Sequence, residues 1–256
     1  MSIKNLIYAC LLLLGFMPFM KVSADNIRIA VASNFILPMR SIVREFEKVT
    51  SHNVQMSYGS SGKFYAQIMN GAPYDIFLSA DTSKPEKLEQ ADRIVTGSRF
   101  TYALGTLVLW TGNELLDVSG PEVISTAGIN KIAIANPRFA PYGIAARQVF
   151  DALKLWPEVK SRLVMGENIS QAYQFVDTGN AQLGLIALSQ IKNRSQANLA
   201  KGWIIPRELH SPIQQQAVMI KTTEKNQQAV TSLMHYLQSA HSKQIIESYG
   251  YALPSG

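Results

Sequence analysis

Short apolar runs alternate with longer segments of helical spacing along the chain, and this alternation most constrains the fold. The run 26–32 is typical of a strand, and the segment 37–49 carries apolar residues at helical spacing. Strands that alternate with helices indicate βαβ units, so we expect an α/β fold with mostly parallel sheets. We expect further strands at 54–58, 75–81, 101–110, 131–135, 183–188, 202–206 and 215–220, and further helices at 63–69, 144–155, 169–179, 229–240 and 242–250.

Residues 1–24 have the pattern of a signal peptide. Lys4 gives a positive start, residues 6–19 are an apolar core, and Val22-Ser23-Ala24 is a small-residue cleavage pattern. The apolar core is shorter than the roughly 20 residues of a membrane span. We expect export to the periplasm, cleavage near Ala24 and a mature chain that is not inserted in the membrane, with a retained N-terminal anchor as the alternative.

The cysteine content and the charge exclude several classes of site. Cys10 is the only cysteine and lies in the leader, so the mature chain has no disulfide, thiolate metal site or cysteine nucleophile. The formal charge is +6, of which Lys4 and Lys21 of the leader supply two, leaving +4. These charges form no run, so nucleic acid is not an expected partner, and a mild positive field is compatible with small anions.

Four strand-to-helix turns share one chemical character. Each places glycine or neutral hydrogen-bond donors where a helix begins, and backbone N–H groups at a helix start are unpaired and attract anions. Each turn alone is explained by ordinary capping, worth about 1 kcal/mol, so an anion site requires that the turns converge. The turns are Ser33-Asn34, Gly59-Ser60-Ser61-Gly62, Pro141-Tyr142-Gly143 and the GENIS segment 166–170.

These turns lie in segments that resemble a known family. The segments are AVASNF (30–35), YGSSGKFYAQI (58–68), GAPYDIFLSAD (71–81), NPRFAPYGIAA (136–146) and GENISQAYQFVDTGNAQLGLIA (166–187). In this order the chain resembles the periplasmic molybdate-binding components of ABC importers, which are type II periplasmic binding proteins. The resemblance implies a two-lobed α/β fold with an oxyanion in the inter-lobe cleft. Lobe I would comprise 25–102 plus 213–256 and lobe II 103–212, with passages near Tyr102 and Ile213.

The resemblance also implies which residues bind the ligand. The hydroxyl and N–H of Ser33 and of Ser61, and the backbone N–H of Tyr142 and of Ile169, would donate to the anion. Asn34 lies beside the first serine, and Ser60 and Gly143 are neighbouring candidates. Many members have a ligand-contacting tyrosine where this chain has Ala187. A second subgroup has a tyrosine at the third turn, so the Tyr142 phenol is a candidate to supply the missing donor.

Molybdate and tungstate are fully deprotonated at neutral pH and only accept hydrogen bonds, which suits a site of neutral donors. The resemblance implies a membrane permease as partner, a monomeric chain, no cofactor and no direct metal-ion ligands. Sulfate, phosphate and tyrosine-bound ferric iron stay as alternatives. Phosphate carries a proton near neutral pH and favours a carboxylate acceptor. Glu167 lies near the fourth turn and could be such an acceptor, but we prefer to interpret it as bonding locally at the helix start or closing the lobes. Lys63 is expected to be solvated.

A periplasmic hydrolase is the remaining alternative. The sequence GSSG at 59–62 lacks the G-x-S-x-G spacing of a nucleophile turn, and GSSGK lacks the spacing of a nucleotide phosphate loop. The four histidines have no recognisable catalytic or metal-binding partner; they are His52, His210, His235 and His241. We therefore expect a binding protein and not an enzyme.

Overall fold

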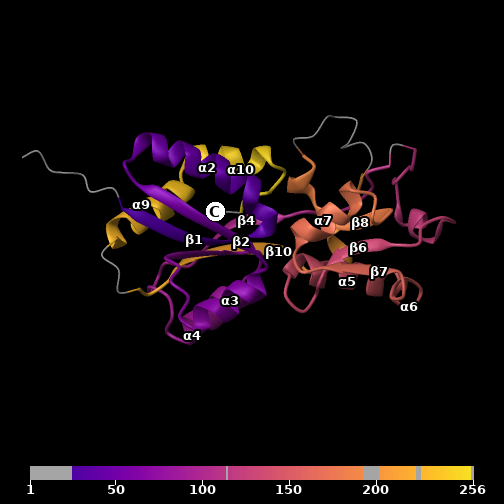
Figure 1. Cartoon of the computed structure of the whole chain (residues 1–256), viewed down its shortest axis with the longest axis horizontal. Coiled ribbons are helices and arrows are strands. Elements are labelled where there is room, and N and C mark those ends of the chain that lie inside the picture. Colours follow the sequence, from indigo (N-terminus) through magenta and orange to yellow (C-terminus); the bar gives the residue numbers. More distant parts are fainter. Residues whose placement is uncertain (1–24, 114, 193–201, 223–225, 255–256) are drawn as a thin grey trace, which may run out of the picture.

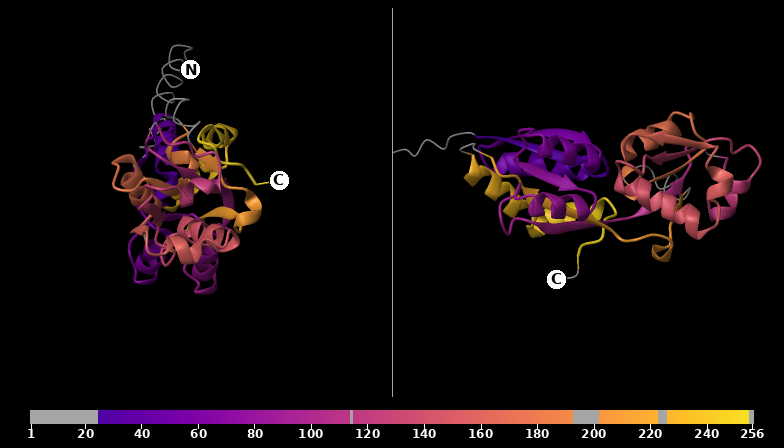
Figure 2. Two further views of the ribbon diagram at one scale, coloured as in Figure 1. Left: turned by 90° about the vertical axis from the view of Figure 1, so that its right-hand side faces the viewer. Right: turned by 90° about the horizontal axis from the view of Figure 1, so that it is seen from below.

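The computed structural model describes residues 25–113, 115–192, 202–222 and 226–254. The expected leader and its expected cleavage position lie outside these residues. The described chain forms two α/β lobes side by side, each built on a five-stranded sheet (Figure 1). The second view in Figure 2 shows the lobes as separate bodies joined by a few extended segments. The expected two-lobed α/β fold is therefore confirmed.

The sheet of the first lobe has the order β2-β1-β3-β10-β4. Strands β1, β2 and β3 are parallel, whereas β10 runs antiparallel to both of its neighbours. Helices α2, α9 and α10 share one apolar cluster with the sheet, and α3 and α4 share another, so the sheet is covered on both faces. The strands are β1 (Asn26–Ala32), β2 (Asn53–Gly59), β3 (Ile76–Ser79), β4 (Phe100–Gly105) and β10 (Ile213–Met219). The helices are α2 (Ile36–Val49), α3 (Ser61–Met69), α4 (Ser83–Gln90), α9 (Gln227–Leu237) and α10 (Ala240–Ser248).

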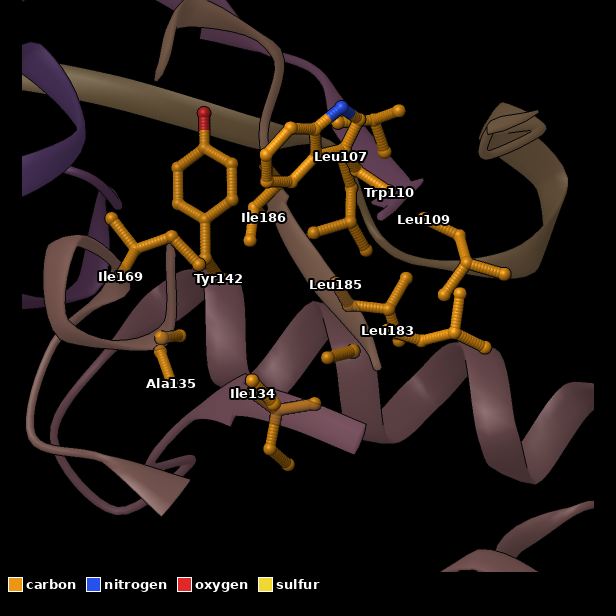
Figure 3. Packing of buried hydrophobic residues seen from close by; sticks show 14 of the residues in the cluster. Leu107, Leu109, Trp110, Ile134, Ala135, Tyr142, Ile169, Leu183, Leu185 and Ile186 are labelled. Carbon is orange, nitrogen blue, oxygen red and sulfur yellow. The ribbon is translucent and has the colours of Figure 1, made fainter. Parts of the chain in front are cut away.

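The sheet of the second lobe has the order β7-β6-β8-β5-β9. Its core is a single cluster of buried residues that includes Trp110, Phe150 and Ile186, and Figure 3 shows this packing around β5, β6 and β8. The strands are β5 (Leu107–Trp110), β6 (Ile132–Ala135), β7 (Leu163–Gly166), β8 (Leu183–Ala187) and β9 (Gly202–Ile204). The helices are α5 (Pro141–Ala152), α6 (Trp156–Val159) and α7 (Ile169–Asp177). Short 3-10 turns are η1 (Ser33–Phe35), η2 (Pro121–Ser125), η3 (Leu188–Gln190) and η4 (Arg207–Leu209).

Two expectations about strands differ from the structure. The run 101–110, expected as one strand, is divided at Thr106 into β4 of the first sheet and β5 of the second. The sheets are mixed and not mostly parallel, because β10 runs antiparallel to β3 and β4 in the first sheet and β5 runs antiparallel to β8 and β9 in the second. The division into lobes near Tyr102 and Ile213 stays a prediction. In the structure, the chain passes from the first sheet to the second at Thr106 and returns to the first sheet just before Ile213.

Candidate functional site

The four turns predicted from the sequence meet at one cavity between the lobes. Its volume is small, about 10 Å³, and both lobes contribute to its wall. Of the seven candidate residues, six line it and Gly143 does not. The first lobe contributes Ala32, Ser33, Asn34, Gly59, Ser60, Ser61 and Ala80, and the second contributes Ala140, Pro141, Tyr142, Asn168 and Ile169. The sequence indicates each of these turns separately, and the fold places all four around one cavity.

The start of α3 presents two serine hydroxyls to the cavity. Ser61 Oγ accepts a hydrogen bond from the backbone N–H of Ala80 at 2.9 Å, so its own hydrogen is left to donate elsewhere. Ser60 is 3 % exposed, and its hydroxyl makes neither a capping bond nor any other hydrogen bond within the described residues. A buried hydroxyl without a partner costs about 1–3 kcal/mol, so Ser60 Oγ marks a position suited to a polar ligand.

Gly62, which follows these serines, makes a direct contact with the second lobe. The N–H of Gly62 donates to the carbonyl oxygen of Phe139 in the second lobe at 2.9 Å. A Cβ at Gly62 would lie 2.9 Å from that same oxygen, which is too close for any other residue. Gly143 also has a packing role, since a Cβ there would lie 2.2 Å from the carbonyl oxygen of Ala135.

The first turn offers the cavity fewer donors than the sequence suggests. Ser33 begins η1 and is 6 % exposed, and its hydroxyl makes no hydrogen bond within the described residues. Asn34 Nδ2 donates both of its hydrogens inside the protein, to Gln215 Oε1 at 2.7 Å and to the Tyr251 hydroxyl at 2.9 Å. The amide of Asn34 is therefore occupied in holding the turn, which leaves its backbone N–H as its available donor.

The second lobe contributes the starts of α5 and α7. Asn168 caps α7 by accepting from the N–H groups of Ser170 and Gln171 at 3.0 and 3.1 Å. The N–H groups of Tyr142 and Ile169 make no hydrogen bond to any residue that the structure describes, and both residues are buried. Figure 3 shows the Tyr142 ring with Ile169 beside it. These two groups are the unpaired first-turn N–H donors that favour an anion.

The phenol of Tyr142 stays protonated under ordinary conditions. Its side chain is 1 % exposed, and burial raises its pKa well above the usual value, with the neighbouring Tyr251 and Tyr102 phenols adding to the effect. Gln215 Nε2 donates to its hydroxyl oxygen at 3.4 Å. The hydroxyl is thus neutral and has one hydrogen to give.

The charged groups near the cavity pair with each other and do not line it. Lys63 Nζ and Glu167 Oε2 lie 2.6 Å apart and join α3 of the first lobe to the turn before α7 of the second. This pair agrees with the closing role preferred for Glu167, whereas Lys63 is paired and not simply solvated. Asp81 pairs with Lys84 at 2.6 Å and lines a separate pocket of about 350 Å³ beside the second passage between the lobes. Within the described residues, no three His, Cys, Asp or Glu side chains gather as a metal site would require.

Sequence reasoning missed the polar residues behind the cavity. Gln215 is fully buried in β10, and Tyr251 and Ser189 hydrogen-bond each other at 3.0 Å beside Asn34. The sequence contains one signal, because three consecutive glutamines, 214–216, interrupt an apolar strand. Tyr251 has no comparable signal, since a tyrosine near the C-terminus is ordinary.

The fold and the cavity together define a class of protein. Two lobes joined by extended segments, with helix starts converging between them, are the architecture of a two-lobed solute-binding protein. The chain belongs to the bacterial extracellular solute-binding protein family, whose model matches residues 27–252. Among the residues that the structure describes, every helix is too short or too polar to be a candidate membrane span.

Known proteins that resemble this chain over most of its length include molybdate-binding proteins. The chain is 46% identical over 231 residues to the molybdate-binding protein ModA of Azotobacter vinelandii, covering 90% of this chain and 91% of that one. It is 39% identical to ModA of Rhodobacter capsulatus, covering 90% and 89%. The solved periplasmic molybdate-binding protein of Azotobacter vinelandii superposes with a TM-score of 0.85 at 38% identity, over 90% of this chain and 100% of that one.

Proposed function

We propose that this chain is the periplasmic molybdate-binding component of an ABC importer and that it also binds tungstate. It would be exported by its leader, cleaved near Ala24, act as a monomer and deliver the oxyanion to a membrane permease. It would bind without turnover and without a cofactor or a metal ion of its own. The convergence of helix starts and hydroxyls on one cavity carries this proposal, and the similarity to molybdate-binding proteins supports it.

The proposed contacts come from both lobes. From the first lobe, Ser33 and Ser61 would each donate a hydroxyl and a backbone N–H, with the Ser60 hydroxyl and the Asn34 N–H beside them. From the second lobe, Tyr142 would donate its N–H and its hydroxyl, and Ile169 its N–H. An anion held in this way links the lobes, so binding would favour the closed arrangement as a hinge motion. The Lys63–Glu167 pair and the Gly62–Phe139 hydrogen bond join the same lobes and would stabilise that arrangement.

The lining chemistry supports a fully deprotonated oxyanion. No Asp or Glu lines the cavity, so a protonated oxyanion would find no carboxylate to accept its hydrogen. Roughly seven charge-assisted hydrogen bonds at about 1.5–3 kcal/mol each give about 10–20 kcal/mol before costs. Ordering and closure reduce this to about 8–12 kcal/mol, which corresponds to roughly micromolar to nanomolar affinity.

Thermal denaturation with a panel of ligands tests the proposal. The panel contains molybdate, tungstate, sulfate, phosphate and Fe³⁺, each at the same concentration. A ligand at a hundredfold excess over its Kd stabilises the folded state by about 2.7 kcal/mol. We expect molybdate and tungstate to raise the melting temperature. A shift with phosphate or Fe³⁺ and none with molybdate would overturn the proposal, and turnover of esters would favour a hydrolase.

A further inference from the structure

Gln215 occupies a central position between the two lobes. It lies in β10, directly after the second passage between the lobes, and is fully buried. The pairing of β10 with β4 is irregular between Gln215 and Gln216, and both of these side chains are buried. A buried amide in a sheet is stable only where its oxygen and its nitrogen both find partners.

The two ends of the Gln215 amide have different partners. Its oxygen Oε1 accepts from Asn34 Nδ2 at 2.7 Å and from the Tyr102 hydroxyl at 3.0 Å, both in the first lobe. Its nitrogen Nε2 then faces the second lobe and donates to the Tyr142 hydroxyl oxygen at 3.4 Å. Because two donors hold the oxygen, the amide presents a donor, and not an acceptor, to Tyr142.

The direction of the bond between Gln215 and Tyr142 decides what the phenol can do. A phenol that accepts from Gln215 keeps its own hydrogen for another acceptor. The Tyr142 hydroxyl and Gln215 Nε2 pack closely against Gly105, so neither group has much room to move. A Cβ atom added at Gly105 would lie 2.2 Å from the Tyr142 hydroxyl and 2.8 Å from Gln215 Nε2. The neighbouring Tyr251 hydroxyl accepts from Asn34 Nδ2 at 2.9 Å and donates to the Asn34 carbonyl oxygen at 2.7 Å. It is also a side-chain partner of the Tyr142 phenol, so a bound oxyanion would take the Tyr142 hydrogen in its place.

We propose that Gln215 is a positioning residue for ligand selectivity, which fixes the Tyr142 hydroxyl as a hydrogen-bond donor toward the bound oxyanion. This inference rests on the proposed oxyanion site and deepens it. With Tyr142 held as a donor, its phenol cannot accept the hydrogen of an oxyanion that carries a proton, and such an oxyanion is disfavoured. Without Gln215, the hydroxyl turns and accepts the hydrogen of a protonated oxyanion such as monohydrogen phosphate.

The test is a double-mutant cycle read as selectivity. The variants are Gln215→Met, Tyr142→Phe and the double variant, and calorimetry gives the Kd for molybdate and for phosphate in each. We expect Gln215→Met to reduce the preference for molybdate over phosphate by about tenfold, equivalent to about 1.4 kcal/mol. In the Tyr142→Phe background, the same change is expected to leave the preference unaltered, because no hydroxyl remains to be oriented.

Several outcomes separate this inference from the function on which it rests. If the unmodified protein does not bind molybdate, the proposed function fails. If it binds and Gln215→Met lowers both affinities equally, Gln215 is only structural and the inference is overturned. If Gln215→Met does not fold, Gln215→Glu replaces it, since its carboxylate retains the Tyr102 and Asn34 bonds but takes the Tyr142 hydrogen. Gln215→Glu should weaken molybdate at least tenfold, and an unchanged affinity would refute the inference.

Discussion

Replacing Ser61 by alanine tests the site at the position where its geometry is best defined. Ser61 is 1 % exposed and its Oγ already accepts from the Ala80 N–H, so the substitution removes a donor to the anion and also leaves Ala80 without its partner. The lost charge-assisted bond should weaken binding by about 1.5–3 kcal/mol, and the unpaired N–H should lower folding stability by about 1–3 kcal/mol. Expressed as affinity, this is a rise in Kd of roughly 10- to 150-fold.

The two effects of Ser61→Ala are separated by a matched control. Ser242 in α10 is also fully buried and donates to the carbonyl oxygen of Tyr236 at 2.6 Å, but it does not line the cavity. Ser242→Ala should therefore lose stability with no change in molybdate affinity. At a molybdate concentration one hundred times the unmodified Kd, stabilisation should fall from about 2.7 to about 0.3–1.3 kcal/mol in Ser61→Ala only. Equal calorimetric affinity in both variants would refute the site assignment.

Three further predictions concern the phenol, the ion pair and alkaline pH. Tyr142→Phe should raise the molybdate Kd about tenfold or more, because a bond to an anion is lost; unaltered calorimetric affinity would leave only its backbone N–H in the site. Glu167→Gln removes a pair whose side chains are 44 and 45 % exposed, so affinity should fall by only about 0.2–1 kcal/mol, and titrations at high salt should abolish the difference. Burial raises the pKa of the Tyr102 and Tyr142 phenols. The unfolded chain therefore loses these protons near pH 10 while the folded chain keeps them. Folding stability should fall as the pH rises above about 10. Melting temperatures between about pH 8 and 11 check this, with a shallower decline expected for Tyr142→Phe and an equal decline counting against the assignment.

The elements that follow simple patterns could be predicted from the sequence. Apolar spacing predicts a helix at 37–49, and α2 runs from Ile36 to Val49 with buried residues on one face. Strand β7 (Leu163–Gly166) and helix α4 (Ser83–Gln90) were not predicted. β7 is an edge strand whose apolar run LVM is only three residues long, which is too short to distinguish a strand. α4 is highly charged, with a proline in its first turn, and lacks apolar residues at helical spacing.

The candidate site could be predicted as a set of turns but not as a network. Ser33, Ser61 and Tyr142 follow strands in the sequence, and their position at helix starts is a local property. The use of the Asn34 amide to hold Gln215 and Tyr251 depends on residues 181 and 217 positions away, which no local pattern can report. The unpaired hydroxyl of Ser60 likewise becomes meaningful only because the fold buries it at the cavity.

A crystal structure with molybdate, with the ion located by its anomalous scattering, tests the central claim most directly. We predict one strong peak between the lobes, within hydrogen-bond distance of the hydroxyls of Ser33 and Ser61 and of the N–H groups of Tyr142 and Ile169. A peak elsewhere, such as in the pocket lined by Asp81 and Gln148, or no peak in crystals soaked well above the measured Kd, would contradict the account.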